Sequence, residues 1–110
     1  MAFDEGLADR VRMVVSRNRG ISERKMFGGL AFMMNGNMFC GVLKSDLMLR
    51  LGPVASVAAL KQPHTRLMDF SGKPMKSMIY VDAAGVDSDT DLQRWVEACL
   101  AFVQTLPTKE

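Results

Sequence analysis

Residues that carry catalysis or bind metals in other proteins are scarce in this sequence. It contains one histidine, His64, and two cysteines, Cys40 and Cys99, among 110 residues. The cysteines form no Cys-x-x-Cys pair, and with a single histidine they make a poor zinc set. His64 as a general base would need a nucleophile and an orienting group, and no nucleophile motif is present. The sequence therefore predicts no catalytic residue, metal or cofactor, and leaves a small enzyme or ligand binder around His64 as an alternative.

Long apolar runs and targeting signals are also missing. The first residues, "MAFDEGLADR", contain acids and lack an apolar core, so they are not a secretory signal. No run approaches the roughly 20 apolar residues of a membrane span, which argues against a membrane partner. Two buried, reduced thiols are the simplest state for the cysteines, although the spacing does not exclude one disulfide. We expect a cytoplasmic protein.

Positive charge exceeds negative charge only slightly. Fourteen lysines and arginines oppose twelve acids, for a net charge of +2, far from the dense basic stripe of a dedicated nucleic-acid binder. Six cations nevertheless cluster within sixteen residues, and they are Arg10, Arg12, Arg17, Arg19, Arg24 and Lys25. They indicate either a basic surface for nucleic acid or a solvated helix face with charged edge strands. The modest overall charge favours the second interpretation.

Periodicity predicts one domain over residues 1–110, of α+β class. Apolar residues at helical spacing predict an amphipathic helix over 4–19 with Asp4 as N-cap, and a final helix that begins after Ser88. Residues 24–52 read as three strands, 53–62 as a short helix, and 65–69 and 75–82 as two further strands. This order, α-β-β-β-α-β-β-α, predicts two layers: an antiparallel sheet of about five strands with helices packed on it.

The segment "RKMFGGLAFMMNGN", residues 24–37, reads as a hairpin and not as a phosphate loop. Gly28 and Gly29 lie inside an extended run, and no helix start or Gly-Lys-Ser/Thr follows. Glycine in a strand more often marks a bulge, a bend or the close approach of another backbone. Asn35-Gly36 is a strong signal for a two-residue turn, with a weaker one at Ser45-Asp46.

Two-residue turns at both positions would define the two faces of this sheet. Phe32 would then lie opposite Phe39, and Leu43 opposite Met48. The face predicted to be covered by helices carries Phe27, Ala31, Met33, Met38, Cys40, Val42, Leu47, Leu49 and Leu51. The face predicted to meet water carries Met26, Leu30, Phe32, Met34, Phe39, Leu43, Met48 and Arg50. A one-residue change of register would exchange the faces.

The predicted outer face is mostly apolar, which is typical of an interaction site. Methionine-rich surfaces can repack against varied partners. Three explanations stay open: a helix of the same chain covers this face, a second copy closes a homodimer there, or a different protein binds it. Arg24 and Lys76, which are polar in or beside apolar strands, are candidate polar contacts.

Four blocks of the sequence carry a family resemblance. They are "ERKMFGGLAFMMNGNMFCGV", "DLMLRLG", "PHTRLMDFSGKPMKSMIYVD" and "DLQRWVEACLAFVQTLP". Together they resemble the N-terminal domain of the TfoX (Sxy) proteins, bacterial regulators of competence for DNA uptake. The resemblance covers nearly the whole chain.

The resemblance implies an antiparallel α+β domain similar to secretion-chaperone-like folds, with no established catalytic residues. In the full regulators a second domain follows, and this chain ends at Glu110, so we expect a stand-alone version. We expect a non-enzymatic regulatory domain that acts through protein contacts, with a nucleic-acid-associated regulator as the alternative.

Overall fold

The computed structural model describes residues 3–26, 28–70 and 73–107, and the side chains of residues 68–76 lie outside this description. Three α-helices are present in the described part: α1 (Glu5–Val15), α2 (Pro53–Ala59) and α3 (Asp89–Val103), with a short 3-10 helix, η1 (Ala83–Val86). The strands are β1 (Ile21–Met26), β2 (Gly29–Met34), β3 (Asn37–Leu43), β4 (Asp46–Arg50), β5 (Thr65–Phe70) and β6 (Lys73–Val81).

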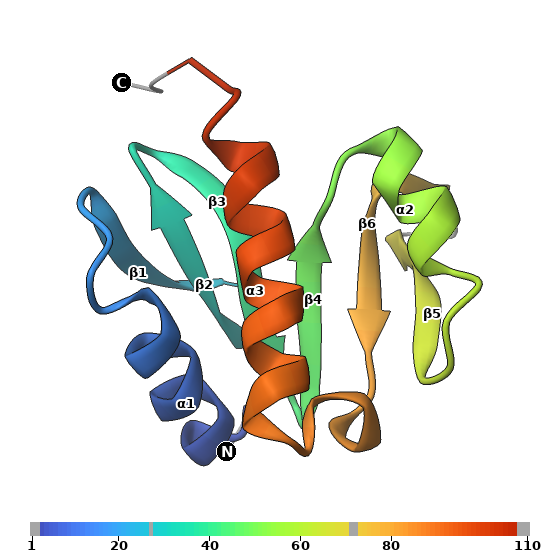
Figure 1. Ribbon diagram of the computed structural model, residues 1–110, viewed down its shortest axis with the longest axis horizontal. Coiled ribbons are helices and arrows are strands. Elements are labelled where there is room, and N and C mark those ends of the chain that lie inside the picture. Colours follow the sequence, from blue (N-terminus) through green and yellow to red (C-terminus); the bar gives the residue numbers. More distant parts are fainter. Residues whose placement is uncertain (1–2, 27, 71–72, 108–110) are drawn as a thin grey trace.

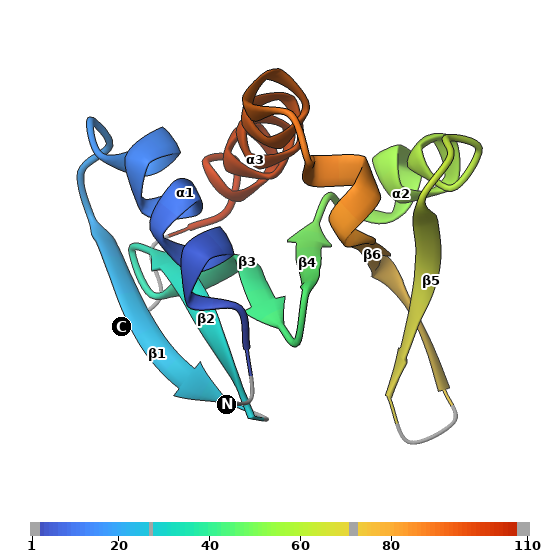
Figure 2. The same cartoon turned by 90° about the horizontal axis from the view of Figure 1, so that it is seen from below.

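The strands form one antiparallel sheet in the order β1-β2-β3-β4-β6-β5. Helix α3 crosses the middle of the sheet, with α1 beside it over β1 and β2, and α2 near β6 (Figure 1). All three helices lie on the same side (Figure 2). The sheet is curved, and β1 and the β5–β6 hairpin both descend away from the helices (Figure 2). The face without helices is therefore the concave one, and the predicted α+β class and element order are confirmed.

The two longer helices begin where their capping residues predict. The Asp4 carboxylate accepts a hydrogen bond from the backbone N–H of Leu7, and the Ser88 hydroxyl accepts one from Asp91. Helix α1 ends at Val15, four residues before the predicted end, and its C-cap is Ser16. Arg17 and Arg19 consequently lie beyond the helix.

The predicted strand over residues 24–34 is in fact two strands. β1 and β2 pair from Ile21↔Met34 to Met26↔Gly29, so the chain reverses its direction between these two strands. Gly28 has φ of +77°, which suits this reversal. At Gly29 a Cβ would lie 2.5 Å from the carbonyl oxygen of Val42, so this glycine permits the close approach of β3.

The predicted pairing of β2 with β3 is wrong by one residue beyond the turn. Asn35 and Gly36 both have positive φ, as the two-residue turn requires, and Met34 pairs with Asn37. A β-bulge follows, so that Phe32 lies opposite Cys40 instead of Phe39. Phe39 is the extra residue, and both Phe39 and Cys40 are fully buried in the core. The bulge exchanges the faces of β2 relative to the prediction.

The core lies between the sheet and the helices. Its largest fully buried side chains include Phe32, Phe39, Leu47, Leu49, Ile79 and Leu92. Leu30 and Met34 of β2 belong to the same cluster, together with Trp95 and Cys99 of α3. The second turn lies at Lys44-Ser45 instead of Ser45-Asp46, because Leu43 pairs with Asp46 and Val42 with Leu47. Leu43 was predicted opposite Met48, so the pairing differs by two residues, and a two-residue difference preserves the predicted faces of β4.

Candidate interaction surface

The concave face of the sheet carries a group of flexible apolar side chains that we call the methionine face. It consists of Met33, Met38, Leu43, Met48, Met78 and Tyr80. Strand alternation places these residues opposite the core, since Phe32, Val42, Leu49 and Ile79 point to the helices. No helix of the described residues covers them (Figure 2).

The floor of the methionine face is packed even without a helix above it. Met48 and Met78 are only 5% and 4% exposed, and Met38, Leu43 and Tyr80 pack against them. Gly41 makes room for this packing, because a Cβ there would lie 2.6 Å from Cε of Met48. The curvature of the sheet brings the neighbouring side chains over the central strands.

An ion network closes one end of this face. Arg66 donates hydrogen bonds to the carboxylates of Asp46 and Asp82. Its guanidinium also lies over the Tyr80 ring, 4.9 Å from the ring centroid. One guanidinium is therefore shared between two carboxylates, and the three groups together keep a net charge of −1.

The other arginines of the concave face have no carboxylate partner in the described part of the chain. Arg50 donates to the carbonyl oxygen of Met38 at 3.3 Å and lies 5.9 Å from the Phe102 ring centroid. It occupies the place where β3 and β4 separate, beyond their last pair, Cys40↔Leu49. Arg24 is exposed on edge strand β1 and pairs with Ala31, which places it on this face.

The predicted interaction surface needs correction. Met26, Leu43, Met48 and Arg50 do lie on the face without helices, as predicted. The other four predicted residues, Leu30, Phe32, Met34 and Phe39, are buried under the helices because of the bulge.

Met33 and Met38, which were predicted to be core, lie on the concave face instead. The sequence holds one signal for the bulge: consecutive apolar residues in "NMFCGV", where strict alternation is lost. The side chain of Lys76, a predicted polar contact, lies outside the described residues.

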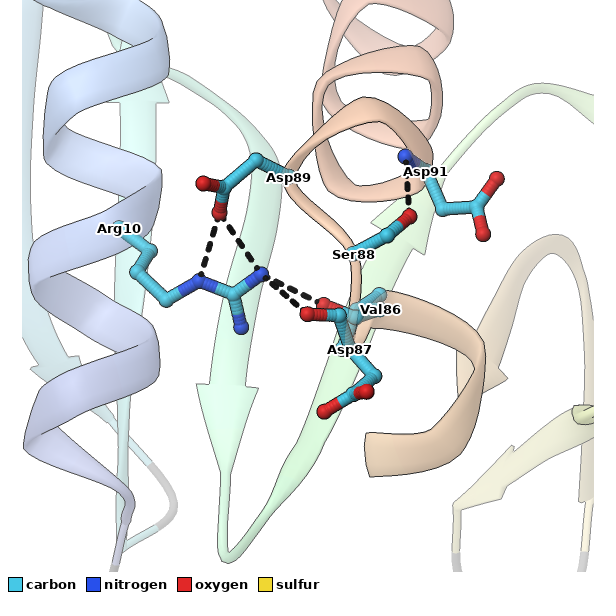
Figure 3. Close-up of polar contacts among 6 residues, drawn as sticks. All are labelled: Arg10, Val86, Asp87, Ser88, Asp89 and Asp91. Atoms are coloured by element: carbon cyan, nitrogen blue, oxygen red, sulfur yellow. Dashed lines mark hydrogen bonds and ion pairs between the residues drawn. The ribbon is translucent and has the colours of Figure 1, made fainter.

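Part of the predicted basic patch forms hydrogen bonds and ion pairs within the molecule. Arg10 points from α1 to the junction between η1 and α3 (Figure 3). It donates to the carbonyl oxygens of Val86 and Asp87, at 2.8 and 3.1 Å, and to the Asp89 carboxylate at 3.1 Å. We call these contacts the Arg10 clip. They join the first helix to the last and leave Arg10 poorly placed for a ligand.

Arg12 is also paired. It donates two hydrogen bonds of 2.7 Å to the Glu23 carboxylate of β1 and one to Asp9. The hydrogen bonds from Arg12 lower the pKa of Glu23. Of the predicted patch, Arg17, Arg19 and Lys25 are left without an ion pair in the described residues. Lys25 pairs with Leu30 and so lies on the face opposite to Arg24.

The fold does not bring the candidate catalytic and metal-binding side chains together. His64 is exposed in a turn with φ of +68°, while Cys40 of β3 and Cys99 of α3 are buried in the core as free thiols. Burial, with the adjacent Cys99 thiol, raises the pKa of Cys40, which keeps it protonated and unreactive. The described residues contain no group of three or more His, Cys, Asp or Glu that could hold a metal ion.

Comparison with known proteins returns one family. The family model of the TfoX N-terminal domain matches residues 14–103, which span every strand, α2 and α3, but only the last two residues of α1. Searches of curated proteins and of solved structures return no match. Among the described residues, no helix has the length and apolar character needed to cross a membrane. The chain therefore belongs to the TfoX N-terminal domain family, a family of regulatory domains.

Proposed function

We propose that this chain is a non-enzymatic, cytoplasmic regulatory domain that acts in bacterial competence by binding another protein. The observation that carries the proposal is the methionine face, an apolar surface on the side of the sheet without helices. A sheet face in water is ordinarily polar, and apolar patches on such faces are typical of interaction sites. The family match supports a competence-regulator-like domain.

Enzymatic chemistry around His64 has less support. A catalytic histidine needs a partner group within hydrogen-bond reach. His64 is exposed, and both cysteines are buried in the core away from it. The family is a regulatory one, which agrees with a non-enzymatic role.

Nucleic-acid binding also has less support than protein binding. Arg10 and Arg12, two members of the basic cluster, are held by internal contacts. Arg17 and Arg19 follow α1, and Arg24 and Lys25 point to opposite faces of β1. Scattered cations of this kind do not make a continuous phosphate-binding surface.

The test replaces Met33 on the concave face in the host that encodes the chain. We expect a chromosomal Met33→Glu allele to reproduce the competence-gene expression and DNA uptake of the deletion strain, at an unchanged protein level. Met13→Glu is the matched control, because Met13 is 78% exposed on α1 and lies on the other side of the molecule. A deletion strain with normal DNA uptake would overturn the role in competence. A Met33→Glu allele that behaves as wild type where the deletion does not would overturn binding through the concave face.

A further inference from the structure

The shape and charge of the methionine face specify the kind of partner, on the assumption that the proposed function is correct. We propose that it takes an amphipathic α-helix of another protein, with an apolar stripe that packs on the methionines and acidic residues beside that stripe. Three properties of the face lead to this assignment: backbone pairing, curvature and charge.

Backbone pairing excludes an extended peptide across the middle of the face. Strands β2, β3, β4 and β6 are each hydrogen-bonded to a neighbour on both sides. An extended peptide satisfies its own N–H and C=O groups by joining an edge strand, which places it beside the sheet and not across it. A helix satisfies its backbone internally and can lie on a face made only of side chains.

Curvature disfavours a second copy of this chain. The methionine face is concave and is deepest at the middle strands, because the ends of β1 and of the β5–β6 hairpin extend below them (Figure 2). Two concave faces would meet at their rims and leave a void between their centres, where packing contributes most to affinity. A helix is convex, about 10 Å in diameter, and fills a curved sheet. About 18 residues make about 27 Å of helix, which matches the 27–31 Å extents of the molecule.

Charge favours acidic residues beside the apolar stripe. Among side chains described on this face, the carboxylates of Asp46 and Asp82 are both bound by Arg66. Arg24 and Arg50 form no ion pair among the described residues. The Arg50 guanidinium is engaged by the Met38 carbonyl and lies 5.9 Å from the Phe102 ring centroid of α3, whereas Arg24 is exposed on the concave face. A partner carboxylate would complement the Arg24 guanidinium, and arginine suits such pairs because its fork can bind both oxygens.

Nucleic acid is a poorer occupant of the same face. Single strands bind sheets by stacking bases on exposed aromatic rings. Tyr80 is the one aromatic side chain described on this face, and Arg66 already covers its ring at 4.9 Å. Methionine side chains instead suit the apolar stripe of a helix, as flexible groups that adapt to its ridges.

The experiment uses three synthetic helices and the methionine methyl signals of the full chain. The first peptide has 18 residues, with leucines on one face and glutamates beside them. The second replaces each glutamate with lysine, and the third scrambles the first so that the leucines no longer share a face. Titration is followed by NMR of ¹³C-methyl methionine, with signals assigned by single Met→Leu variants.

The expected result is specific to the glutamate peptide. It should shift the signals of Met33, Met38, Met48 and Met78 while that of Met13, on α1, stays in place. Binding of the lysine peptide should be at least about tenfold weaker, as like charges oppose each other at the rim. Arg24→Glu should weaken the glutamate peptide about threefold or more, and added salt should weaken it as well.

Two methionine variants test whether the peptide binds at the methionine face. Met38→Glu should weaken the glutamate peptide about tenfold or more while circular dichroism shows an unchanged fold, and Met13→Glu should bind as wild type. Equal binding of the scrambled or lysine peptide, or shifts centred on Met13, would overturn the proposal. Methionine signals that move with protein concentration alone would identify a second copy as the occupant. No binding by any peptide, alongside a defective Met33→Glu allele in the host, would reject the helix and leave protein binding by this face intact.

Discussion

The two faces of the sheet are built from the same strands but from different kinds of side chain. The covered face uses stiff or bulky residues such as Phe32, Leu49 and Ile79, each with no exposed surface. The concave face uses methionines, which have three rotatable bonds and adapt to irregular neighbours. Alternation along a strand therefore separates a surface that specifies one packing from a surface that can accept several. The following predictions test this difference, from the largest expected effect to the smallest.

Adjacent residues of β3 offer the most direct test. Phe39 is fully buried under the helices, whereas Met38 is half-buried on the concave face. We expect Phe39→Asp to abolish folding, because loss of the ring costs about 3–5 kcal/mol and the buried charge adds several more. Met38→Asp should cost about 1 kcal/mol or less, as its charge stays hydrated. Urea unfolding followed by circular dichroism measures both, and a stable Phe39→Asp protein would contradict the observed register.

Adding a methyl group at Gly41 tests how tightly the floor of the methionine face is packed. A Cβ there would lie 2.9 Å from the carbonyl oxygen of Leu30, in addition to its contact with Met48. We expect Gly41→Ala to lower the free energy of unfolding by about 1–3 kcal/mol, the usual cost of overpacking. The double variant Gly41→Ala/Met48→Ala separates the two contacts by thermal unfolding. If Gly41→Ala stabilises the protein, the floor is looser than its burial indicates.

The covered side also contains a polar element, the Arg10 clip. Removing the guanidinium leaves the partly buried carbonyl of Val86 without this donor. We expect Arg10→Met, which keeps the aliphatic stem, to lower stability by about 1–2 kcal/mol. Asp89→Asn is the control and should change it by less than about 0.5 kcal/mol, since Asp89 is 93% exposed. Similar losses for both variants would mean that the ion pair, and not the carbonyl contacts, stabilises the helix pair.

The smallest effect concerns the exposed pair of Arg12 and Glu23. The hydrogen bonds from Arg12 lower the pKa of Glu23 below its ordinary value of 4.5, so the pair stabilises the fold above that pH. The stabilisation is lost as pH falls through the lowered pKa and the carboxylate protonates. We expect Glu23→Gln to cost below about 1 kcal/mol at pH 7, and nothing once the pH is below both pKa values. Urea unfolding of both proteins across this range measures it; a difference that persists in acid would indicate a role other than charge.

The sequence predicted the elements better than the faces. Asp4, Ser88 and Asn35-Gly36 act through their nearest neighbours, and each does in the structure what local chemistry predicts. The bulge at Phe39 depends instead on the gain from burying a ring under α3, which lies some fifty residues further along the chain. No short-range pattern reports that gain. Half of the predicted surface was therefore assigned to the wrong side of the sheet, while β4, beyond a turn displaced by one residue and a pairing displaced by two, kept its faces.

The bulge lets β3 place two consecutive side chains, Phe39 and Cys40, in the core without disturbing β2. Met33 pairs with Met38 and Phe32 with Cys40, so Phe39 is the residue that has no partner opposite it. With the Asn35-Gly36 turn kept, a chain that lacked this one residue would retain both pairs and both faces of β2, and would lose only a buried ring. Among members of this family, a gap at this position would thus mark a protein with the same exposed face and a smaller core.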